Sequence, residues 1–537
     1  MSKFNKPDTA RAAVRSPVTT TGPSGRTFEG APAHARDPRS ELFTLAVSNM
    51  VGEKTFYEPG TARDGRYRSL IRTVAQSDPV WLHQMLVWLR TEANMRSAAG
   101  VGAAEMVRAR PVAGVEPLPY GPTGRSVERL TVDGVCQRAD EPGEILAYWL
   151  STYGRPVPNA LKRGLADAQR RLYTQRGLLR YDSSASAVRF GDVLDLTHPR
   201  PSDDRQSALF KLALDQRHGR DIDLSGVPLP TIAAFHQLRA RAAEDPAVLA
   251  DPDALRAAAM KWETALSLAG DSVGRARMWE ALVDSMGYMA LLRNLRGLDQ
   301  ADVSDEVAER VAARLADPAE VAASRQFPYR FWSAYKHAPS LRWGPALEKA
   351  LDAACGNIPS LPGATLVLVD VSGSMGATLS ERSKVTLAEV GALFGCALAK
   401  RGERVTLAGF ATDHFVHRFR PGGSVLRETE TFCGMIGQVG WGTRTAEALH
   451  ASYNGHDRVV IVTDEQTFGS RYGAVSEQAP ARVPMYAFNL GGYEPAMMAT
   501  GSGNRHELGG LTDATFKMIN LLERRRDARW PWEISPR

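Results

Sequence analysis

The period of the hydrophobic pattern changes near residue 356, and this change constrains the fold more than any other feature of the chain. From about residue 39 to 350, apolar residues recur at steps of three and four in segments broken by Pro, Gly and Asp. After Gly356 the pattern becomes short apolar, β-branched runs that alternate with helical segments. The sequence therefore predicts an all-helical region followed by an α/β domain.

The helical region follows a segment with no periodicity. Residues 1–38 mix Pro, Gly, Ser, Thr and Arg, and we expect a flexible basic arm because such a segment buries too little apolar surface to offset the entropy of ordering. Amphipathic helices are predicted at 40–51, 78–90, 158–173, 231–243, 275–286 and 305–316. Helices of this length with short connections stack into an irregular HEAT-like repeat solenoid or ring. We therefore expect an extended binding surface over 39–356.

The carboxy-terminal region, 357–537, alternates strand-like and helix-like segments. The run TLVLVD at 365–370 is almost wholly apolar and ends in an acid, as expected of a strand buried on both faces of a parallel sheet. Further strands are predicted at 404–410, 457–463 and 483–490, and helices at 383–400, 445–453 and 511–522. This alternation is typical of a doubly wound α/β domain with a parallel sheet.

Oxygen-bearing side chains follow the predicted strands at positions that a parallel sheet brings to one edge. The set comprises Asp370, Ser372, Ser374, Thr443 and Asp464. Because ligands of such domains bind outside the carboxyl ends of the strands, we expect these residues to converge. Two carboxylates and three hydroxyls are hard oxygen ligands that suit Mg²⁺. So few charged ligands leave the ion incompletely neutralised, and it can accept an acidic group from a partner.

Other interpretations of the same stretch are weaker. A D-x-S-x-S pattern also occurs as a strand-ending turn whose Ser residues cap a helix. A serine hydrolase elbow needs G-x-S-x-G, and a phosphotransfer aspartate needs a second acid, where position 372 is Ser. The buried strand before the motif, the G-x-T in the middle and the T-D at the end together favour the metal site. We predict no catalytic residue.

The charge of the chain is compatible with a nucleic-acid partner. The formal net charge is +6 and Arg strongly outnumbers Lys, a bias that a GC-rich genome explains as well as phosphate binding does. The densest candidate patch for RNA consists of Lys162, Arg163, Arg170, Arg171, Arg176, Arg180, Arg189, His198, Arg200 and Lys211. The interleaved aromatic residues Tyr173, Tyr181 and Phe190 could stack on unpaired bases. A solvated helix face, or for His198 a partly buried histidine bonded to backbone, explains single members equally well.

Several classes of protein are excluded. Cys136, Cys355, Cys396 and Cys433 are far apart and form no CxxC pair, which argues against a zinc knuckle or a disulfide framework. No apolar run approaches the roughly 20 residues needed to cross a bilayer, and the amino terminus lacks the apolar stretch of a secretory signal. We therefore expect a cytoplasmic protein with reduced thiols and no membrane span.

Several motifs in fixed order resemble the Ro autoantigen family, in which a helical-repeat module named TROVE precedes a von Willebrand factor A-type domain. In the helical half the resemblance rests on MVGEKTFY at 50–57, GDVLDLTHPRP at 191–201, KWE at 261–263 and MALLRNL at 289–295. In the other half it rests on DVSGSM at 370–375 and VTDEQTF at 462–468. The resemblance implies a TROVE module over 39–356 and a von Willebrand factor A-like domain over 357–537.

The resemblance also implies a function. In the family the helical module is similar to a monomeric ring that is closed by the A domain. The basic hole of this ring admits single-stranded 3′ ends of misfolded or immature noncoding RNA. Y RNAs bind the outer basic surface of the ring. By resemblance this chain is a non-enzymatic ribonucleoprotein scaffold that hands RNA to a nuclease, polynucleotide phosphorylase in bacterial members. Arg189 and Phe190 stand where vertebrate members carry a Ser-His pair, so a Y RNA contact there differs. The alternative is a metal-dependent protein-binding adaptor with a helical scaffold.

Overall fold

A computed structural model of the chain describes residues 14–48, 51–109, 124–338, 340–358, 360–381, 383–420, 422–501, 503–510, 518–519, 522–523 and 529–533. The chain divides into two compact units. Unit 1 lies within 1–74, 326–333 and 348–537, and unit 2 within 75–325 and 334–347. The predicted helix at 511–522, the end of the one at 40–51 and the first third of the predicted arm fall largely on residues outside the described ranges.

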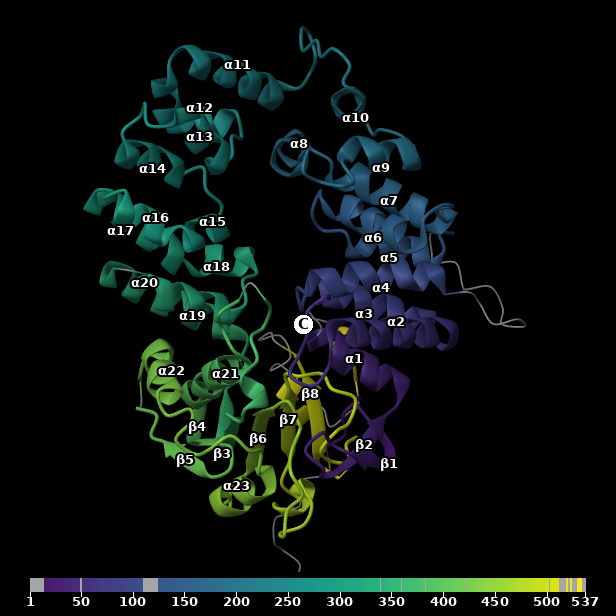
Figure 1. Ribbon diagram of the computed structural model, residues 1–537, viewed down its shortest axis with the longest axis vertical. Helices are drawn as coiled ribbons and strands as arrows, with labels where there is room; N and C mark the ends of the chain where they lie inside the picture. The colour runs from purple at the N-terminus through teal and green to yellow at the C-terminus, as the bar shows by residue number, and fades with distance from the viewer. Residues whose placement is uncertain are drawn as a thin grey trace, which may run out of the picture. The chain divides into compact units, whose positions relative to one another are not determined.

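Unit 2 is built from helices, as the three- and four-residue periodicity predicted (Figure 1). Its helices are α3 (Pro79–Thr91), α4 (Arg96–Arg108), α5 (Val127–Val135), α6 (Glu141–Tyr153), α7 (Asn159–Leu172), α8 (Gln175–Tyr181), α9 (Phe190–Thr197), α10 (Asp204–His218), α11 (Pro230–Glu244), α12 (Pro252–Ala257), α13 (Trp262–Ala269), α14 (Arg275–Val283), α15 (Tyr288–Arg293), α16 (Leu295–Gln300), α17 (Asp305–Ala316) and α18 (Pro318–Ser324). Two more, α19 (Pro328–His337) and α20 (Gly344–Ala354), cross the unit boundaries.

The first helices of unit 2 contact its last described ones. Asn94 Nδ2 donates to the carbonyl oxygen of Arg325 at 2.7 Å, and Arg325 Nη1 donates to the carbonyl oxygen of Thr91 at 3.2 Å. These bonds join the end of α3 to the end of α18. The repeat therefore returns to its starting point within unit 2 and does not remain an open solenoid.

Local signals explain where the helices begin. Asp78 precedes α3, its carboxylate accepts a hydrogen bond from Trp81 N at 3.1 Å, and Pro79 occupies the first helical position. Ser304 precedes α17 but makes no capping hydrogen bond, and Asp305 and Glu306 supply acidic side chains to the first turn there. Both helices begin directly after a Ser or Asp residue that precedes an apolar segment.

Unit 1 contains a six-stranded sheet. Its strands are β3 (Leu361–Asp370), β4 (Gly402–Phe410), β5 (His414–His417), β6 (Arg458–Thr463), β7 (Met485–Asn489) and β8 (Arg505–Gly509), in the spatial order β5-β4-β3-β6-β7-β8. All neighbours are parallel except β4 and β5. The four predicted strands are confirmed. The edge strands β5 and β8 were not predicted, because HFVH and RHELG lack the apolar run of a buried strand.

Helices cover both faces of this sheet and bury its central strands. Leu366 and Leu368 of β3 pack in an apolar cluster with α23 (Thr445–Ser452). On the other face, Val367 and Val369 lie beside α21 (Leu387–Arg401), where the Cα of Gly395 comes so close that an added Cβ would lie 2.7 Å from Val369. The helix α22 (Val425–Cys433) packs against α21. Because β3 is buried on both sides, its sequence is almost wholly apolar.

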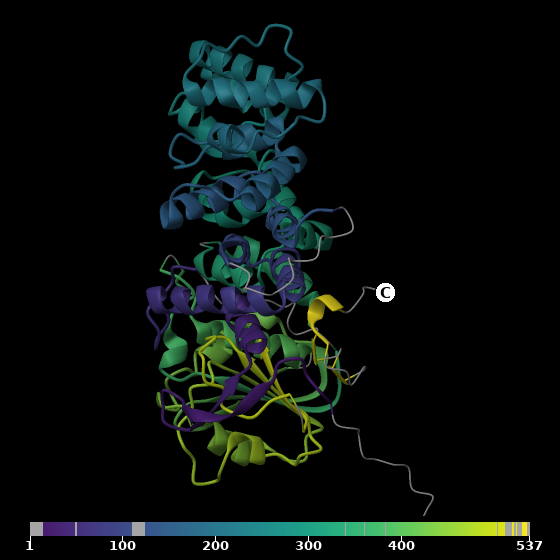
Figure 2. The same ribbon diagram turned by 90° about the vertical axis from the view of Figure 1, so that its right-hand side faces the viewer.

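The amino-terminal segment is not a free arm where the structure describes it. Strands β1 (Thr20–Arg26) and β2 (Pro32–Arg36) form an antiparallel hairpin that lies on the β8 side of the sheet (Figures 1 and 2). The buried Arg36 guanidinium donates to both carboxylate oxygens of Glu507 in β8 and to Glu465 Oε2 at 3.3 Å. The expectation of a flexible arm was therefore wrong for residues 20–36, because Arg36 supplies a buried partner that apolar periodicity does not register.

The predicted boundary at residue 39 also differs from the structural one. The helix α1 (Pro38–Ser48) packs on β8, and both it and most of α2 (Gly60–Ser77) belong to unit 1. Arg63 of α2 is buried and donates to the carbonyl oxygens of Gly491 and Ser48 at 2.6 and 3.0 Å. The four cysteines are free thiols. Every helix in the described ranges is too short or too polar to span a membrane.

Candidate metal centre and nucleic-acid interface

The predicted metal ligands lie at the carboxyl edge of the sheet, where the strand order reverses. Strand β4 lies on one side of β3 and β6 on the other, so the loops that follow β3 and β6 diverge. In open α/β sheets this divergence creates the crevice in which ligands bind. Asp370 is the last residue of β3, and Asp464 directly follows β6. The two acids therefore reach one crevice from strands that are adjacent in space.

Asp370 is held from both sides. Its Oδ1 accepts a hydrogen bond from Ser372 N at 2.9 Å, and its Oδ2 accepts one from Thr463 Oγ1 at 2.6 Å. The side chain is fully buried. These bonds set the carboxylate in a single orientation at the end of β3, as a preorganised ligand requires.

The hydroxyl groups come from two loops that bind each other. Ser372 Oγ and Ser374 Oγ lie 3.3 Å apart, and both residues are buried. Gly373 N donates to the carbonyl oxygen of Trp441 at 2.9 Å, which holds the loop after β3 against the loop that carries Thr443. Gly440 in that loop has a φ of 79° and no room for a Cβ, which would lie 2.7 Å from Thr412 Oγ1. The G-W-G-T sequence therefore places the buried Thr443 beside the same crevice.

Asp464 carries the clearest sign of a cation-binding site. It is fully buried, and its Oδ2 has no hydrogen-bond partner among the described residues. Burial raises the pKa of Asp370 to about 6, and burial together with the negative charge of Asp370 raises the pKa of Asp464 to about 7. Two buried carboxylates whose ionised forms are disfavoured, next to three hydroxyl-bearing residues, fit a divalent cation that would neutralise them.

The donor set favours a hard ion. The described residues contain no group of three or more His, Cys, Asp or Glu side chains placed to hold a metal. A centre built on Asp370, Ser372, Ser374, Thr443 and Asp464 would therefore rely on hydroxyl and carboxylate oxygens. Such ligands suit Mg²⁺, which keeps octahedral geometry and some water, and they suit zinc poorly.

The residues bordering this crevice were not predicted. Tyr57 donates a hydrogen bond from its hydroxyl to Glu29 Oε1, and the same hydroxyl interacts with Ser374. Burial raises the pKa of Tyr57, and so do the carboxylates of Glu29 and Asp464. Tyr57 belongs to the MVGEKTFY motif, so a signal existed for it. Glu29 lies in the segment that was expected to be flexible, which hid it.

The predicted basic patch separates into exposed and internally paired members. Arg171, Arg189 and Lys211 form ion pairs with Asp133, Asp182 and Asp215. Arg171 also donates to the carbonyl oxygen of Cys136 at 2.7 Å, and Arg189 is only partly exposed. These bonds stabilise the helical unit and reduce the charge available to a phosphate. Arg163, Arg170, Arg176, Arg180 and Arg200 are exposed, and Lys162 is half-buried.

Two of the three interleaved aromatic residues are core residues. Tyr173 and Phe190 are buried and stack on each other with ring centroids 4.0 Å apart. They cannot stack on RNA bases, and that part of the prediction was wrong, since helix packing turned their side chains inward. Tyr181 is half-buried, and the guanidinium groups of Arg138 and Arg180 lie 4.9 and 5.6 Å from its ring centroid. It alone of the three remains accessible.

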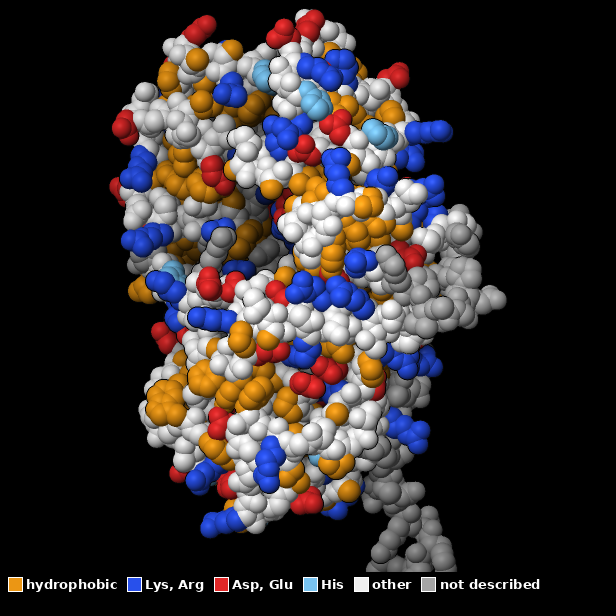
Figure 3. Space-filling view, turned by 45° about the vertical axis from the view of Figure 1, so that its right-hand side comes forward, with side chains coloured by type: hydrophobic (Ala, Val, Ile, Leu, Met, Phe, Trp, Pro, Cys, Tyr) orange, Lys and Arg blue, Asp and Glu red, His pale blue; other side chains and the backbone are white. Residues whose placement is uncertain are grey.

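A cavity of about 740 Å³ opens within unit 2 beside Tyr181. Its basic residues are Arg176, Arg180, Arg256, Lys261 and Arg293. Its acidic residues are Glu263 and Asp284, so positive charges outnumber negative ones. Burial lowers the pKa of Lys261, and nearby Arg180 lowers it further against the attraction of Glu263. Figure 3 shows the helical part of the molecule hollowed, with Lys and Arg side chains at the rim. The cavity therefore presents an excess of cations and the aromatic rings of Tyr181 and Trp262.

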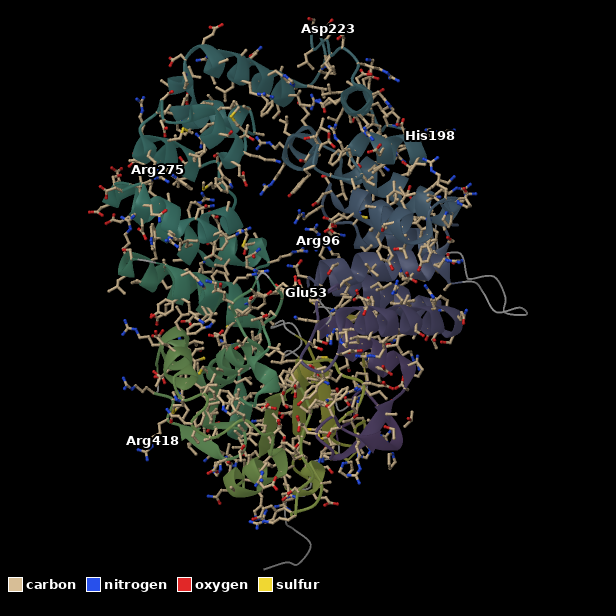
Figure 4. The ribbon with its side chains drawn as sticks, in the orientation of Figure 1. Glu53, Arg96, His198, Asp223, Arg275 and Arg418 are labelled. Carbon is tan, nitrogen blue, oxygen red and sulfur yellow. The ribbon has the colours of Figure 1, made fainter. Side chains whose placement is uncertain are left out.

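Sequence reasoning placed only two of these residues, Arg176 and Arg180, among its RNA-binding candidates. Lys261 and Trp262 belong to the KWE motif, which was noted for its resemblance and not for its charge, and Arg293 belongs to the MALLRNL motif. His198 ends α9 in a left-handed backbone conformation with a φ of 45°. Its side chain is exposed on the outer side of the α5 to α9 stack (Figure 4). The alternative of a partly buried histidine was therefore wrong.

Comparisons with known proteins agree with this architecture. Residues 257–342 match the TROVE domain family. A stretch of 76 residues is 43% identical to telomerase protein component 1 of Rattus norvegicus and 42% identical to that of Mus musculus, covering 14% of this chain. The chain spans only 3% of the length of these relatives. The fold is similar to that of the Ro (RSR) protein of Deinococcus radiodurans, with a TM-score of 0.61 at 18% identity over 90% of this chain and 99% of that one.

Proposed function

We propose that this chain, a Ro-type protein by its TROVE segment and its fold, is a non-enzymatic RNA-binding scaffold that takes single-stranded RNA ends into the basic cavity of unit 2. The observation that carries the proposal is the convergence of five Lys and Arg residues with Tyr181 and Trp262 on one cavity. Phosphate groups bind the cations, and an unpaired base has a face that either ring can stack on. The TROVE match covers Lys261, Trp262 and Arg293, which supports this assignment.

A cavity of this kind accepts RNA by shape and charge. Neutralisation of phosphates by Lys and Arg supplies affinity that is tolerant of sequence and decreases steeply with salt. A duplex is wider than a single strand and its bases are already stacked, so the cavity favours an unpaired 3′ end. Misfolded or immature noncoding RNAs with such ends are the substrates that we assign to it. Their delivery to a nuclease, polynucleotide phosphorylase in a bacterium, completes the proposed role in RNA quality control.

A second RNA surface lies outside the cavity in this proposal. Arg163, Arg170, His198 and Arg200 are exposed, and no ion pair joins them to an acid among the described residues. Helical RNA is read mainly through its phosphates and 2′-hydroxyl groups, which suits such a dispersed set of cations. We assign a structured, Y-type RNA to this surface. The metal centre of unit 1 takes no part in RNA binding and holds Mg²⁺.

The experiment that tests this function measures binding of three fluorescein-labelled RNAs of equal length across a salt series. One is single-stranded, one is a blunt duplex and one is a duplex with a single-stranded 3′ overhang. We expect the overhang and the single strand to bind at least tenfold more tightly than the blunt duplex, because only they can enter the cavity. Equal affinity for all three, or none, would contradict a cavity that selects ends.

A metal-dependent protein-binding adaptor is the second candidate, and one observation favours it. Trp441 borders the metal crevice and is 62% exposed, an unusual state for a large apolar side chain. The ultraviolet absorbance ratio of the purified protein separates the two candidates, because copurified RNA raises absorbance at 260 nm relative to 280 nm. A ratio typical of pure protein that does not change with ribonuclease treatment would favour the adaptor.

A further inference from the structure

We propose that the cavity of unit 2 reads the sugar of its RNA ligand: Glu263 and Asp284 accept hydrogen bonds from ribose 2′-hydroxyl groups and so select RNA over DNA. This inference rests on the proposed RNA-binding function and adds sugar specificity to it. The cations of the cavity cannot supply that specificity by themselves, because RNA and DNA present the same phosphate groups. The 2′-hydroxyl group is what distinguishes the two nucleic acids at a given site.

The acids of the cavity come from other helices than the arginines of α8. Helix α8 contributes only Arg176, Arg180 and Tyr181 to the lining, and neither arginine is paired with an acid in the described part of the chain. Glu263 lies in the first turn of α13, and Asp284 directly follows α14, which packs on α13. The α8 wall therefore attracts phosphates, whereas the wall of α13 and α14 also offers carboxylates.

The guanidinium group of Arg180 lies close to the segment that carries Asp284. Its Nη2 atom is 3.4 Å from the position that a Cβ atom on Gly287 would take, and Gly287 follows Asp284 by three residues. Burial lowers the pKa of Lys261, while Glu263 raises this pKa and Arg180 lowers it, so these charges share one part of the cavity. A nucleotide whose phosphate binds Arg180 therefore has its ribose beside the wall that carries the acids.

The two carboxylates have unused capacity to accept hydrogen bonds. Glu263 lines the cavity, and no hydrogen bond or ion pair joins it to another residue in the ranges that the structure describes. Asp284 Oδ2 lies 3.9 Å from Arg310 Nη1, and this distance is longer than a hydrogen bond. An ionised carboxylate can only accept hydrogen bonds, so a ligand that satisfies these groups must bring donors.

Two neutral residues of the lining have already used a donor within the protein. Ser285 Oγ donates to the carbonyl oxygen of Leu282 at 2.9 Å, and Asn294 Nδ2 donates to that of Ala290 at 2.8 Å. The hydroxyl oxygen of Ser285 and Oδ1 of Asn294 therefore remain as acceptors. Every ribose of RNA carries a 2′-hydroxyl donor whatever its base, so acceptors of this kind select the sugar and tolerate any base sequence.

A strand without 2′-hydroxyl groups leaves these acceptors unsatisfied. Deoxyribose presents only C–H groups at the 2′ position, so Glu263 and Asp284 would lose water and gain no hydrogen bond in return. A site that hydrogen-bonds a hydroxyl group rejects the analogue that lacks it for this reason. The same carboxylates repel phosphate groups, and in the DNA complex no hydrogen bond offsets that repulsion. The acids therefore weaken DNA binding more than RNA binding.

The test compares three fluorescein-labelled single strands that bind the full chain at one salt concentration. They are RNA, DNA and 2′-O-methyl RNA of one sequence that lacks uracil and thymine. We expect RNA to bind about tenfold more tightly than DNA, because a hydrogen bond to a charged group is at stake. The 2′-O-methyl strand keeps the sugar conformation of RNA but has no 2′ donor, so it should bind as weakly as DNA. Fluorescence anisotropy measures the three Kd values.

Removing the two acids should remove the preference and keep the binding. In the double variant Glu263→Ala, Asp284→Ala we expect the Kd for DNA to differ from that for RNA by less than about twofold. Affinity for DNA should stay equal or increase, because two negative charges no longer oppose the phosphates. A structural defect would instead weaken binding of both strands. Glu309→Ala is the matched control, because it removes an exposed acid of α17 outside the cavity lining and should keep the wild-type ratio.

The failure of this inference differs from the failure of the proposed function. If the wild type binds RNA and DNA equally, or if the double variant keeps the wild-type ratio, the acids do not read the ribose and the RNA-binding cavity stands. If 2′-O-methyl RNA binds as tightly as RNA, sugar conformation causes the preference and the inference is overturned. If the wild type binds none of the single strands at low salt, the proposed function fails and takes the inference with it.

Discussion

At the scale of single residues, the proposed metal centre combines groups that are costly to bury with groups that orient them. Asp464 has a carboxylate oxygen with no hydrogen-bond partner among the described residues, and its pKa is raised to about 7 by burial and by Asp370. A buried polar atom without a partner is destabilising unless a ligand satisfies it. The site is therefore stable only when an ion or a proton compensates the charge.

Removing either acid should abolish stabilisation by Mg²⁺. A ligand that binds only the folded state stabilises it by about 2.7 kcal/mol when its concentration is 100 times its Kd. We expect the melting temperature of the wild type to rise with Mg²⁺ and to fall with chelator, whereas Asp464→Asn and Asp370→Asn should be insensitive to both. RNA affinity should be unchanged in the variants, because the proposed RNA cavity is lined by residues of unit 2 alone. A wild type with equal melting temperatures in Mg²⁺ and chelator would contradict a stabilising metal.

His506 should make unit 1 sensitive to acid. It is fully buried in β8 beside Tyr486, neither ring nitrogen has a hydrogen-bond partner among the described residues, and burial, with a further contribution from Arg505, lowers its pKa to about 4. In the unfolded chain the imidazole of His506 is protonated near pH 6.5, whereas in the folded chain it is protonated only near pH 4. Stability is therefore lost as the pH falls from about 6.5 toward 4, with a total loss of about 3 kcal/mol.

The measurement is urea unfolding of the wild type and of His506→Phe between pH 7.5 and 4. Other groups titrate in this range and some act in the opposite direction, so the difference between the two proteins is the quantity to compare. We expect the wild type to lose stability relative to His506→Phe as the pH falls. A difference that stays constant with pH would show that His506 is protonated equally in both states.

At the scale of elements, a buried charge joins the amino-terminal hairpin to the sheet. Arg36 of β2 is paired with Glu507 of β8 and with Glu465, and it also donates to the carbonyl oxygen of Tyr493 at 2.9 Å. Burial raises the pKa of Glu465 well above its usual value, as does the neighbouring Glu507, while Arg36 opposes both. The hairpin is thus a structural part of unit 1, and Arg36 supplies its buried charge.

Replacing Arg36 should destabilise unit 1 strongly. In Arg36→Met, Glu507 and Glu465 would remain buried without their cation, and breaking such a pair costs about 3 to 5 kcal/mol. Chemical denaturation followed by circular dichroism would measure the loss. Arg15→Met is the matched control, because Arg15 is exposed in the same segment and should change stability by less than about 0.5 kcal/mol. Comparable losses in the free energy of unfolding in both variants would show that the stability of the hairpin depends on the overall positive charge of the segment and not on the Arg36 ion pairs.

At the scale of the whole molecule, the two units separate two kinds of chemistry. Unit 1 carries hydroxyl and carboxylate oxygens at a sheet edge, and unit 2 carries guanidinium groups and aromatic rings around a cavity. Substitutions in one unit should therefore leave the ligand of the other unaffected. The salt dependence of RNA binding tests this separation, because it counts phosphate contacts directly.

Replacing Arg176, Arg180 and Arg293 together by Gln should weaken binding of a 3′-overhang RNA and flatten its salt dependence. Each lost phosphate contact removes roughly 0.7 to 0.9 from the slope of log affinity against log salt, so the triple variant should lose about 2 units. The effect should be nearly independent of base sequence. The matched control is Arg163, Arg170 and Arg200 replaced by Gln, which lie on the exposed patch and should lower affinity for structured RNA instead. If both triple variants lost affinity equally for the overhang RNA and for the structured RNA, the cavity and the exposed patch would not be two distinct RNA-binding surfaces.

The amino-acid sequence by itself determined the order of elements and the two acids that meet at the edge of the sheet. Buried parallel strands need apolar, β-branched runs, which the sequence shows directly. The carboxyl ends of such strands lie at one edge of the sheet, regardless of the sequence of the segments that connect them. Asp370 and Asp464 could therefore be paired across 94 positions, and the structure brings them to one crevice. The edge strand β5 escaped prediction because four residues carry too little pattern.

Only the tertiary structure decided which charged and aromatic residues are available to a ligand. Arg171 and Arg176 look alike in the sequence, yet Arg171 is paired with Asp133, 38 positions away, and Arg176 faces the cavity. Tyr173 turned into the core while Tyr181 did not. Whether a polar side chain is paired, buried or exposed depends on its neighbours from distant segments of the chain. The ion pair between Arg36 and Glu507 is an example, because these residues lie far apart in the sequence. Local periodicity reports which face of an element is apolar, and it carries no information about which partner meets the polar one.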